Sequence, residues 1–140
     1  MMTLKFHPDM SLPTEPNSLF VFGSNLAGRH GGGSARYAHD NLGAEWGVYS
    51  GVTGQCYAVP TVDSNIMPLP LELVEFYVDK LIEYAWEHNR ITFFCTKVGG
   101  GIAGFADEQI APLFSNAPPN FDFPEEWKQY LDIAPASTAG

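Results

Sequence analysis

The sequence predicts an α/β fold: one compact domain of three layers, with helices on both faces of a mainly parallel, mixed sheet. Two observations carry this prediction. Short apolar runs typical of buried strands alternate along the chain with segments whose apolar residues recur at helical spacing. In addition, glycine-rich turns stand next to several of these runs, where connections between strands and helices are expected.

Length and charge limit the function classes. The chain has 140 residues, of which 45% are apolar and 16% charged, enough for a hydrophobic core without disulfide or metal staples. Its formal net charge of −9 argues against general nucleic-acid binding, because neutralising phosphates requires many Lys and Arg side chains. A small anionic ligand is compatible with this net charge, because backbone amides around a site can outweigh the negative electrostatic field of the whole chain. No apolar run is long enough to span a membrane and the start lacks a secretory signal, so we expect a cytoplasmic protein.

The amino-terminal part of the chain leads into the first buried strand. Residues 1–18 contain three prolines among polar residues and predict an irregular lead-in, with an edge strand near residues 4–7. A central strand is predicted at residues 20–22, and the chain then breaks at residues 23–33 into a polar, glycine-rich turn. Apolar residues at helical spacing after this turn predict a helix that ends at about Leu42.

The middle of the chain contains the strongest helix signal. Gly43 suits the end of the preceding helix, because a positive φ costs glycine least. Residues 46–54 form a second glycine-punctuated connection, which leads into a strand predicted over residues 55–60 and ended by Pro60. Residues 71–88 place apolar side chains on one helical face and acidic side chains on the other. We therefore expect a long amphipathic helix there.

The carboxyl-terminal part repeats the pattern of strand and glycine turn. Residues 91–96 are β-branched and aromatic, which predicts a third buried strand, and residues 97–105 form a second glycine-rich turn. Asp107 opens a short helix, residues 115–122 form a connector rich in Pro and Asn, and a last short helix starts at Pro124. The expected boundaries are 1–18 for the lead-in, 19–131 for the α/β domain and 132–140 for a flexible tail.

The glycine clusters are the strongest candidates for a binding site. A strand, a flexible turn and a helix start, in that order, bring backbone amides to a point where they bind an anion. Glycines have no side chain to block a phosphate, and ligands of parallel sheets bind outside the carboxyl ends of the strands. We expect the three clusters to meet at one edge and to form a pocket for a nucleotide or ADP-ribose. The residues expected to bind this ligand are Gly23, Ser24, Asn25, Leu26, Ala27, Gly28, Gly31, Gly32, Gly33, Thr53, Gly54, Gly99, Gly100, Gly101, Ile102, Ala103, Gly104 and Phe105.

Simpler roles remain open for the same residues. The first turn has neither the lysine of a Walker motif nor the spacing of a dinucleotide fingerprint, so tight turns alone also explain its glycines. Asn25 is a candidate for orienting a ribose or a water, or it caps its own turn. His30 and Asp107 are candidate proton carriers. The alternatives are an exposed loop histidine without a role and an ordinary helix start.

No metal or other cofactor is expected. The four histidines have no Cys or carboxylate at the spacing of a metal site. Cys56 and Cys95 lie in strand-like apolar runs, which predicts buried free thiols rather than a disulfide.

The glycine clusters and their flanking strands resemble the macro domain family. Residues 20–28 and 31–35 are similar to the first ligand loop of macro domains, in which a strand and an Asn lead to a glycine run and a helix. Residues 98–105 are similar to the second loop of the family, which wraps a diphosphate, and residues 51–60 resemble the region between the loops. The resemblance extends from Leu19 to Phe114 and is nearest to small macro-like proteins of bacteria and their phages.

This resemblance implies an ADP-ribose ligand, since macro domains bind ADP-ribose and several remove it from proteins, nucleic acids or small molecules. Of the family's Asn-Ala-Asn motif, here Ser24-Asn25-Leu26, only Asn25 carries over, and the early Asp that reads adenine in many members has no clear counterpart. The leading hypothesis is a hydrolase of an ADP-ribosyl derivative, with that ligand or an ADP-ribosylated macromolecule as its partner. The alternative is a module, encoded by a bacterium or a phage, that binds or sequesters ADP-ribose or a signalling nucleotide without chemistry. A third hypothesis is an interaction protein whose glycine loops only form turns.

Overall fold

The computed structural model describes residues 4–8 and 10–131 of the chain, which form one α/β domain. Its strands are β1 (Lys5–His7), β2 (Ser18–Asn25), β3 (Gly51–Thr53), β4 (Cys56–Val62), β5 (Thr92–Cys95) and β6 (Phe121–Pro124). Its helices are α1 (Gly33–Leu42), α2 (Leu71–Glu87), α3 (Asp107–Ile110) and α4 (Lys128–Leu131), with the 3-10 turns η1 (Ala111–Phe114) and η2 (Glu125–Trp127).

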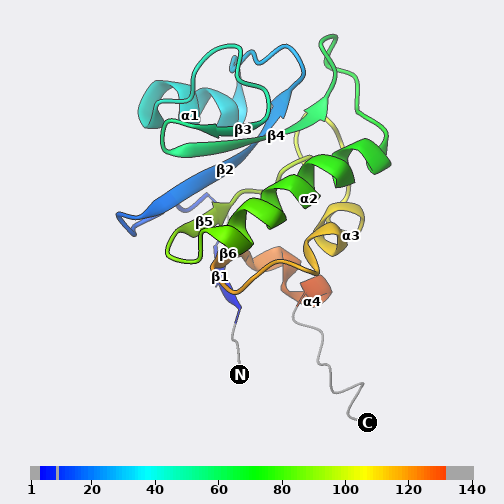
Figure 1. The fold of residues 1–140 in the computed structure, drawn as a ribbon. Helices are drawn as coiled ribbons and strands as arrows, with labels where there is room; N and C mark the ends of the chain where they lie inside the picture. Colours follow the sequence, from blue (N-terminus) through cyan, green and yellow to red (C-terminus); the bar gives the residue numbers. More distant parts are fainter. Residues whose placement is uncertain (1–3, 9, 132–140) are drawn as a thin grey trace.

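The six strands form a single mixed sheet in the order β1-β6-β5-β2-β4-β3. Every neighbouring pair is parallel except β3 with β4, which form an antiparallel hairpin. The carboxyl ends of β1, β6, β5, β2 and β4 therefore all lie along one edge of the sheet. In Figure 1, α1 lies on one side of this sheet and α2 on the other.

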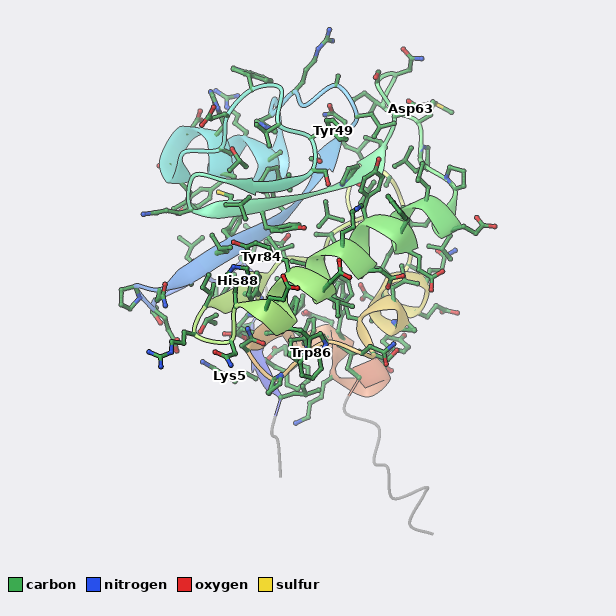
Figure 2. All side chains as sticks on the ribbon, viewed as in Figure 1. Lys5, Tyr49, Asp63, Tyr84, Trp86 and His88 are labelled. Atoms are coloured by element: carbon green, nitrogen blue, oxygen red, sulfur yellow. The ribbon has the colours of Figure 1, made fainter. Side chains whose placement is uncertain are left out.

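Alternating side chains of the strands supply a core on each face. In β2, Leu19 and Val21 join the larger core, whereas Phe20 and Phe22 join the smaller one. The larger core lies beneath α2, α3 and the two 3-10 turns, and the smaller one lies beneath α1, which contributes Ala38. Figure 2 shows the side chains that fill the space between these layers. The predicted three-layer α/β fold is confirmed.

The strongest sequence signals formed the expected elements. In α2, the buried positions Val74, Val78 and Leu81 follow the apolar stripe, and Tyr84 stacks on His88 near its end (Figure 2). Gly43 adopts a left-handed conformation with φ of 82° after α1, as predicted. The edge strand expected near residues 4–7 is β1, and the predicted tail at 132–140 lies outside the described residues.

Two strands lie where the sequence predicted connections. Strand β6 occupies the end of the Pro- and Asn-rich connector, because Phe121 and Phe123 bury their rings in the larger core. Strand β3 occupies the second glycine-punctuated connection and pairs with β4. The prediction that Pro60 ends its strand is wrong, since β4 continues to Val62. Proline is tolerated there because β3 reaches only Ala58, so no residue of β3 pairs with Pro60.

Candidate functional site

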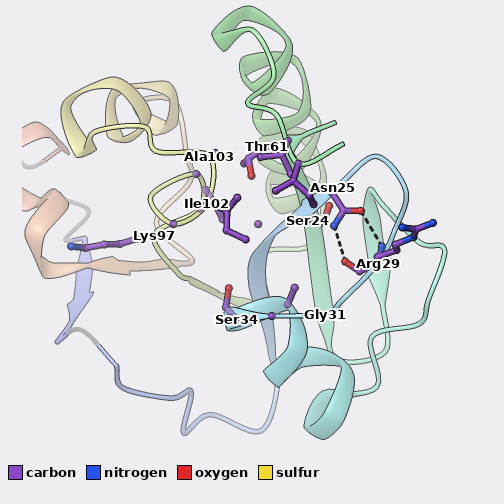
Figure 3. A pocket seen from close by; sticks show the side chains of 18 residues that line it. Ser24, Asn25, Arg29, Gly31, Ser34, Thr61, Lys97, Ile102 and Ala103 are labelled. Carbon is purple, nitrogen blue, oxygen red and sulfur yellow. Dashed lines mark hydrogen bonds between the residues drawn. The ribbon is translucent and has the colours of Figure 1, made fainter. Parts of the chain in front are cut away.

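A cleft opens at the carboxyl edge of the sheet. Its central cavity has a volume of about 500 Å³, and Asn25 at the end of β2 and Val62 at the end of β4 line it (Figure 3). Both glycine turns flank this cavity, with Gly32 on one wall and Gly101 on the other. The predicted ligand residues that line it are Gly23, Ser24, Asn25, Gly31, Gly32, Gly33, Gly99, Gly101, Ile102 and Ala103.

Both turns present backbone donors that have no protein partner. Among the hydrogen bonds of the described residues, none uses the amides of residues 31–33 or 101–103 as donors. Helix α1 makes its first bond only from the Arg36 amide to the Gly32 carbonyl, and Gly32 offers no capping side chain. An unpaired amide needs water or a ligand as its acceptor. Two such arrays around one cavity suit an anion.

Three of these glycines have no structural requirement for glycine. The φ angles of Gly31, Gly32 and Gly101 are not positive, and a Cβ built on any of them meets nothing within 4 Å. In contrast, Gly33 and Gly104 have φ of 57° and 76° and form their turns for conformational reasons. Glycine costs roughly 0.5–1 kcal/mol of stability relative to alanine in regular structure. Glycine at the three positions leaves the backbone on the cavity wall open to close approach.

The charged side chains that line the cavity are opposite in sign to the net charge of the chain. Although the net charge is −9, the titratable side chains that line the cavity among the described residues are Arg29 and Lys97. The first turn of α1 carries no acidic residue, so the positive end of the helix dipole is not neutralised there. The Lys97 ammonium lies 3.8 Å from Asp107 and 3.7 Å from Glu126, and Figure 3 shows its side chain directed away from the cavity centre.

Asn25 closes the turn that it belongs to. Its Nδ2 donates to the Arg29 carbonyl at 2.7 Å, and its Oδ1 accepts from the Arg29 amide at 3.0 Å (Figure 3). The capping alternative therefore describes its contacts, although Asn25 also lines the cavity. Because Asn25 lies on the cavity wall, its role in orienting a ligand stays a prediction.

His30 does not have the exposed position expected of a loop histidine. Its side chain is 1% exposed, donates through Nε2 to the Glu45 carbonyl at 2.7 Å, and stacks on Trp46. The His30 ring also makes a T-shaped contact with the Phe22 ring, with the two centroids 5.4 Å apart. The turn therefore folds this side chain under the loop and against the smaller core. His30 is not among the residues lining the cavity.

Asp107 also lies away from the cavity lining. Its Oδ1 accepts a hydrogen bond from Trp127 Nε1 at 3.0 Å, and its Oδ2 faces Lys97. These contacts join the start of α3 to η2, so the observed surroundings are those of a helix start with a docking role.

The expectation that all three glycine clusters meet at one edge is wrong for the second cluster. Thr53 ends β3 and Gly54 begins the turn into β4, whereas the cavity lies at the other end of β4, beyond Val62. Gly54 serves packing instead, because a Cβ there would lie 2.5 Å from the Gly43 backbone. The other predicted ligand residues that do not line the cavity are Leu26, Ala27, Gly28, Gly100, Gly104 and Phe105.

A second lobe continues the cleft toward β1 and β6. This lobe has a volume of about 510 Å³ and shares Gly33, Ser34, Lys97 and Gly101 with the central cavity. Its aromatic wall was not predicted from the sequence and is made of Phe20, Tyr37 and Phe94, together with His7. No local pattern marks these residues, since they come from three strands and one helix that only the tertiary fold brings together.

Among the described residues, no Asp, Glu, His or Cys lines the central cavity, and the Lys97 ammonium at its wall faces Asp107 and Glu126. Cys56 and Cys95 are free and buried as predicted, and burial raises the pKa of the Cys56 thiol to about 12. Within the described residues, no three His, Cys, Asp or Glu side chains gather to hold a metal, and no helix is long and apolar enough to cross a membrane.

Comparisons with known proteins identify the fold. No protein-family model and no curated protein sequence matches the chain. Among solved structures, the chain is similar to the macrodomain of Mycobacterium tuberculosis DarG, with a TM-score of 0.63 and 16% sequence identity. The similarity covers 89% of this chain and 97% of the DarG macrodomain chain. The chain therefore has the macrodomain fold.

Proposed function

We propose that this protein binds ADP-ribose or a closely related nucleoside diphosphate sugar. The observation that carries the proposal is the pair of unpaired amide arrays at residues 31–33 and 101–103, on opposite sides of one cavity. The macrodomain fold and the resemblance of both turns to the ligand loops of macro domains support the same ligand. The volumes of the two lobes suit a ligand that contains a diphosphate and a nucleoside.

In this proposal the two glycine turns hold the diphosphate, and each lobe holds one end of the ligand. The aromatic lobe takes the base, because its lining is mostly apolar and includes the half-buried ring of Tyr37 beside the buried rings of Phe20 and Phe94. The sugar at the other end lies near Asn25 and Ile102 in the central cavity. The exposed side chain of Ile102 lies at this end, where an attached protein or nucleic acid would leave the cleft.

We propose binding without hydrolysis as the function that the geometry favours. The cavity wall lacks a carboxylate, histidine or thiol among the described residues, and the expected proton carriers His30 and Asp107 are engaged elsewhere. A hydrolase remains an outcome of the test below. The cytoplasm of a bacterium or an infected host remains the expected location.

Two measurements on the same protein test this function. Calorimetry with ADP-ribose is expected to give saturable binding of one ligand per chain, and ligand at 100 times its Kd should stabilise the fold by about 2.7 kcal/mol. Incubation with a mono-ADP-ribosylated protein, followed by chromatography, is expected to show binding but no release of ADP-ribose. Release would establish a hydrolase instead. If neither ADP-ribose nor the modified protein binds, the proposal is wrong.

A further inference from the structure

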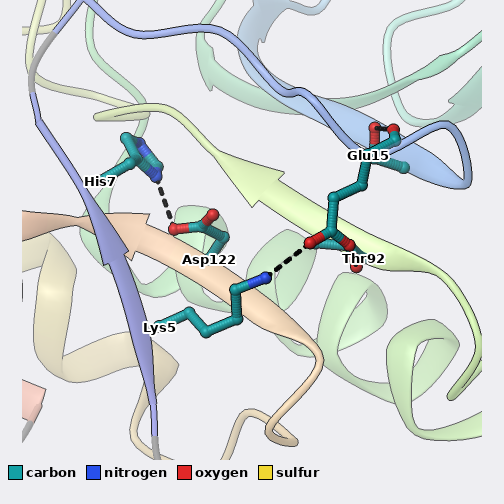
Figure 4. Close-up of polar contacts among 6 residues, drawn as sticks. Lys5, His7, Glu15, Thr92 and Asp122 are labelled. Carbon is teal, nitrogen blue, oxygen red and sulfur yellow. Dashed lines mark hydrogen bonds and ion pairs between the residues drawn. The ribbon is translucent and has the colours of Figure 1, made fainter.

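The most strongly organised polar pair outside the glycine turns is formed by His7 and Asp122. His7 is the last residue of β1, and its Nδ1 lies 2.8 Å from Asp122 Oδ1 on β6 (Figure 4). The His7 ring stacks on Phe94 with centroids 3.9 Å apart and an interplanar angle of 15°. His7 is only 9% exposed. Its ring is therefore held in one orientation by a carboxylate at one edge and an aromatic face.

The two nitrogens of this ring have different surroundings. Asp122 lines a neighbouring cavity of about 280 Å³ and not the aromatic lobe, whereas His7 lines both. Since the two nitrogens of an imidazole point in nearly opposite directions, Nε2 is directed away from Asp122, and the ring that carries it lines the lobe. Nε2 has no hydrogen-bond partner among the described residues. The lobe thus has one free polar atom on a fixed, buried ring.

The carboxylate determines what that atom can recognise. A carboxylate only accepts hydrogen bonds, so a neutral His7 places its proton on Nδ1 and donates it to Asp122. Nε2 is then a hydrogen-bond acceptor. A base with an exocyclic amino group can donate a hydrogen bond to Nε2. A base with a carbonyl oxygen at that position cannot, because the oxygen and Nε2 are both acceptors and their lone pairs repel each other.

We propose that His7 is a specificity-determining residue that selects ligands whose base carries an amino group, and that Asp122 is the positioning residue that fixes its tautomer. This inference rests on the proposed function, because it requires the base to occupy the aromatic lobe. Adenine carries the required amino group, and hypoxanthine replaces that group with a carbonyl oxygen while keeping the same size. The pair of ADP-ribose and its inosine analogue therefore isolates this single interaction.

A purely structural role for the pair makes a different prediction. His7 and Asp122 could serve only to join β1 to β6, which also pair through the backbone at Phe6 and Phe123. Loss of such a link would lower the melting temperature and weaken both ligands by the same factor. Only a role in base selection changes the ratio of the two dissociation constants.

The test is calorimetric titration of the full chain with ADP-ribose and with its inosine analogue. Wild-type protein should bind ADP-ribose at least about tenfold more tightly than the inosine analogue. In His7→Phe, which keeps a ring against Phe94, the two ligands should bind within about twofold of each other. Asp122→Asn should also reduce the ratio, because an amide accepts or donates and no longer fixes the tautomer. Lys5 is on the same strand as His7, and Lys5→Gln, which breaks its exposed pair with the loop residue Glu15, should leave the ratio unchanged.

The outcomes separate this inference from the proposed function. If wild-type protein binds neither ligand, the proposed function is wrong and the inference falls with it. If it binds both equally well, the function stands and the role of His7 is overturned. If His7→Phe does not fold, Asp122→Asn decides, and a wild-type ratio in that variant also overturns the inference.

Discussion

Gly32→Asp should stabilise the protein and at the same time weaken its ligand binding. Gly32 is the N-cap of α1, has extended backbone with φ of −158°, and has open space where a Cβ would be. An aspartate there can accept a hydrogen bond from an unpaired amide of the first helical turn, which glycine cannot do. The same carboxylate would lie where we place the diphosphate.

The two effects can be given magnitudes. Aspartate exceeds glycine as an N-cap by a few tenths of a kcal/mol, and its charge at the helix N-terminus adds about 0.3–1 kcal/mol. Together they should raise the melting temperature by about 2–4 °C in a domain of this size. Repulsion between unit charges at about 4 Å lies between about 1 kcal/mol in water and about 4 kcal/mol at an effective dielectric constant of about 20. Affinity for ADP-ribose should therefore fall by between about fivefold and a thousandfold.

Thermal unfolding without ligand and calorimetry with ADP-ribose measure the two effects separately. Gln55→Glu is a matched control, because it adds one negative charge to an exposed side chain in the β3–β4 turn, at the opposite end of the sheet. It should leave the affinity for ADP-ribose unchanged. Gly32→Asp protein that binds ADP-ribose with wild-type affinity would refute the placement of the diphosphate, and a lower melting temperature would refute the N-cap argument.

Three further predictions use the same physical reasoning. Gly101→Ala should keep the free energy of unfolding or raise it by up to about 1 kcal/mol, and it should weaken ADP-ribose binding. Gly54→Ala should instead reduce stability, because its Cβ would lie 2.5 Å from backbone atoms. Denaturant titration and calorimetry measure this contrast, and an unstable Gly101→Ala protein would contradict it. Glu126→Gln should tighten ADP-ribose binding severalfold, because it removes a carboxylate that lies 3.7 Å from the Lys97 ammonium and competes with the ligand for it. Unchanged or weaker affinity in calorimetry would contradict a contribution of Lys97 to binding. Burial raises the pKa of the Cys56 thiol from 9.0 to about 12, so this thiol ionises in the unfolded chain at lower pH than in the folded protein. The free energy of unfolding should therefore fall as the pH rises from about 9 toward 12. Denaturant midpoints at about pH 8 and pH 10.5 test this, and a Cys56→Ala control should show a smaller fall.

The sequence signals for the glycine turns were reliable because each turn directly follows a buried strand. In a parallel sheet the carboxyl ends of the strands share one edge, so the turn after β2 and the turn after β5 had to meet. The cluster at Thr53 and Gly54 comes before a strand instead. It therefore belongs to the opposite end of the sheet, a distinction that glycine content alone does not make.

Other features depend on the tertiary structure. The burial of Phe121 and Phe123 overrides the Pro- and Asn-rich composition around β6, so local pattern favoured a connector. His30 is buried by the path of its own turn, which sequence does not specify. The His7–Asp122 pair joins positions that are 115 residues apart, and it becomes visible only once β1 is placed beside β6.

The central claim is that two turns distant in sequence hold one diphosphate through backbone amides. Titration of ¹⁵N-labelled protein with ADP-ribose, followed by amide chemical shifts, tests it most directly. The amides of residues 31–33 and 101–103 should shift together, with a single Kd that matches calorimetry. Shifts confined to one turn, or to the exposed face of α2, would contradict the account.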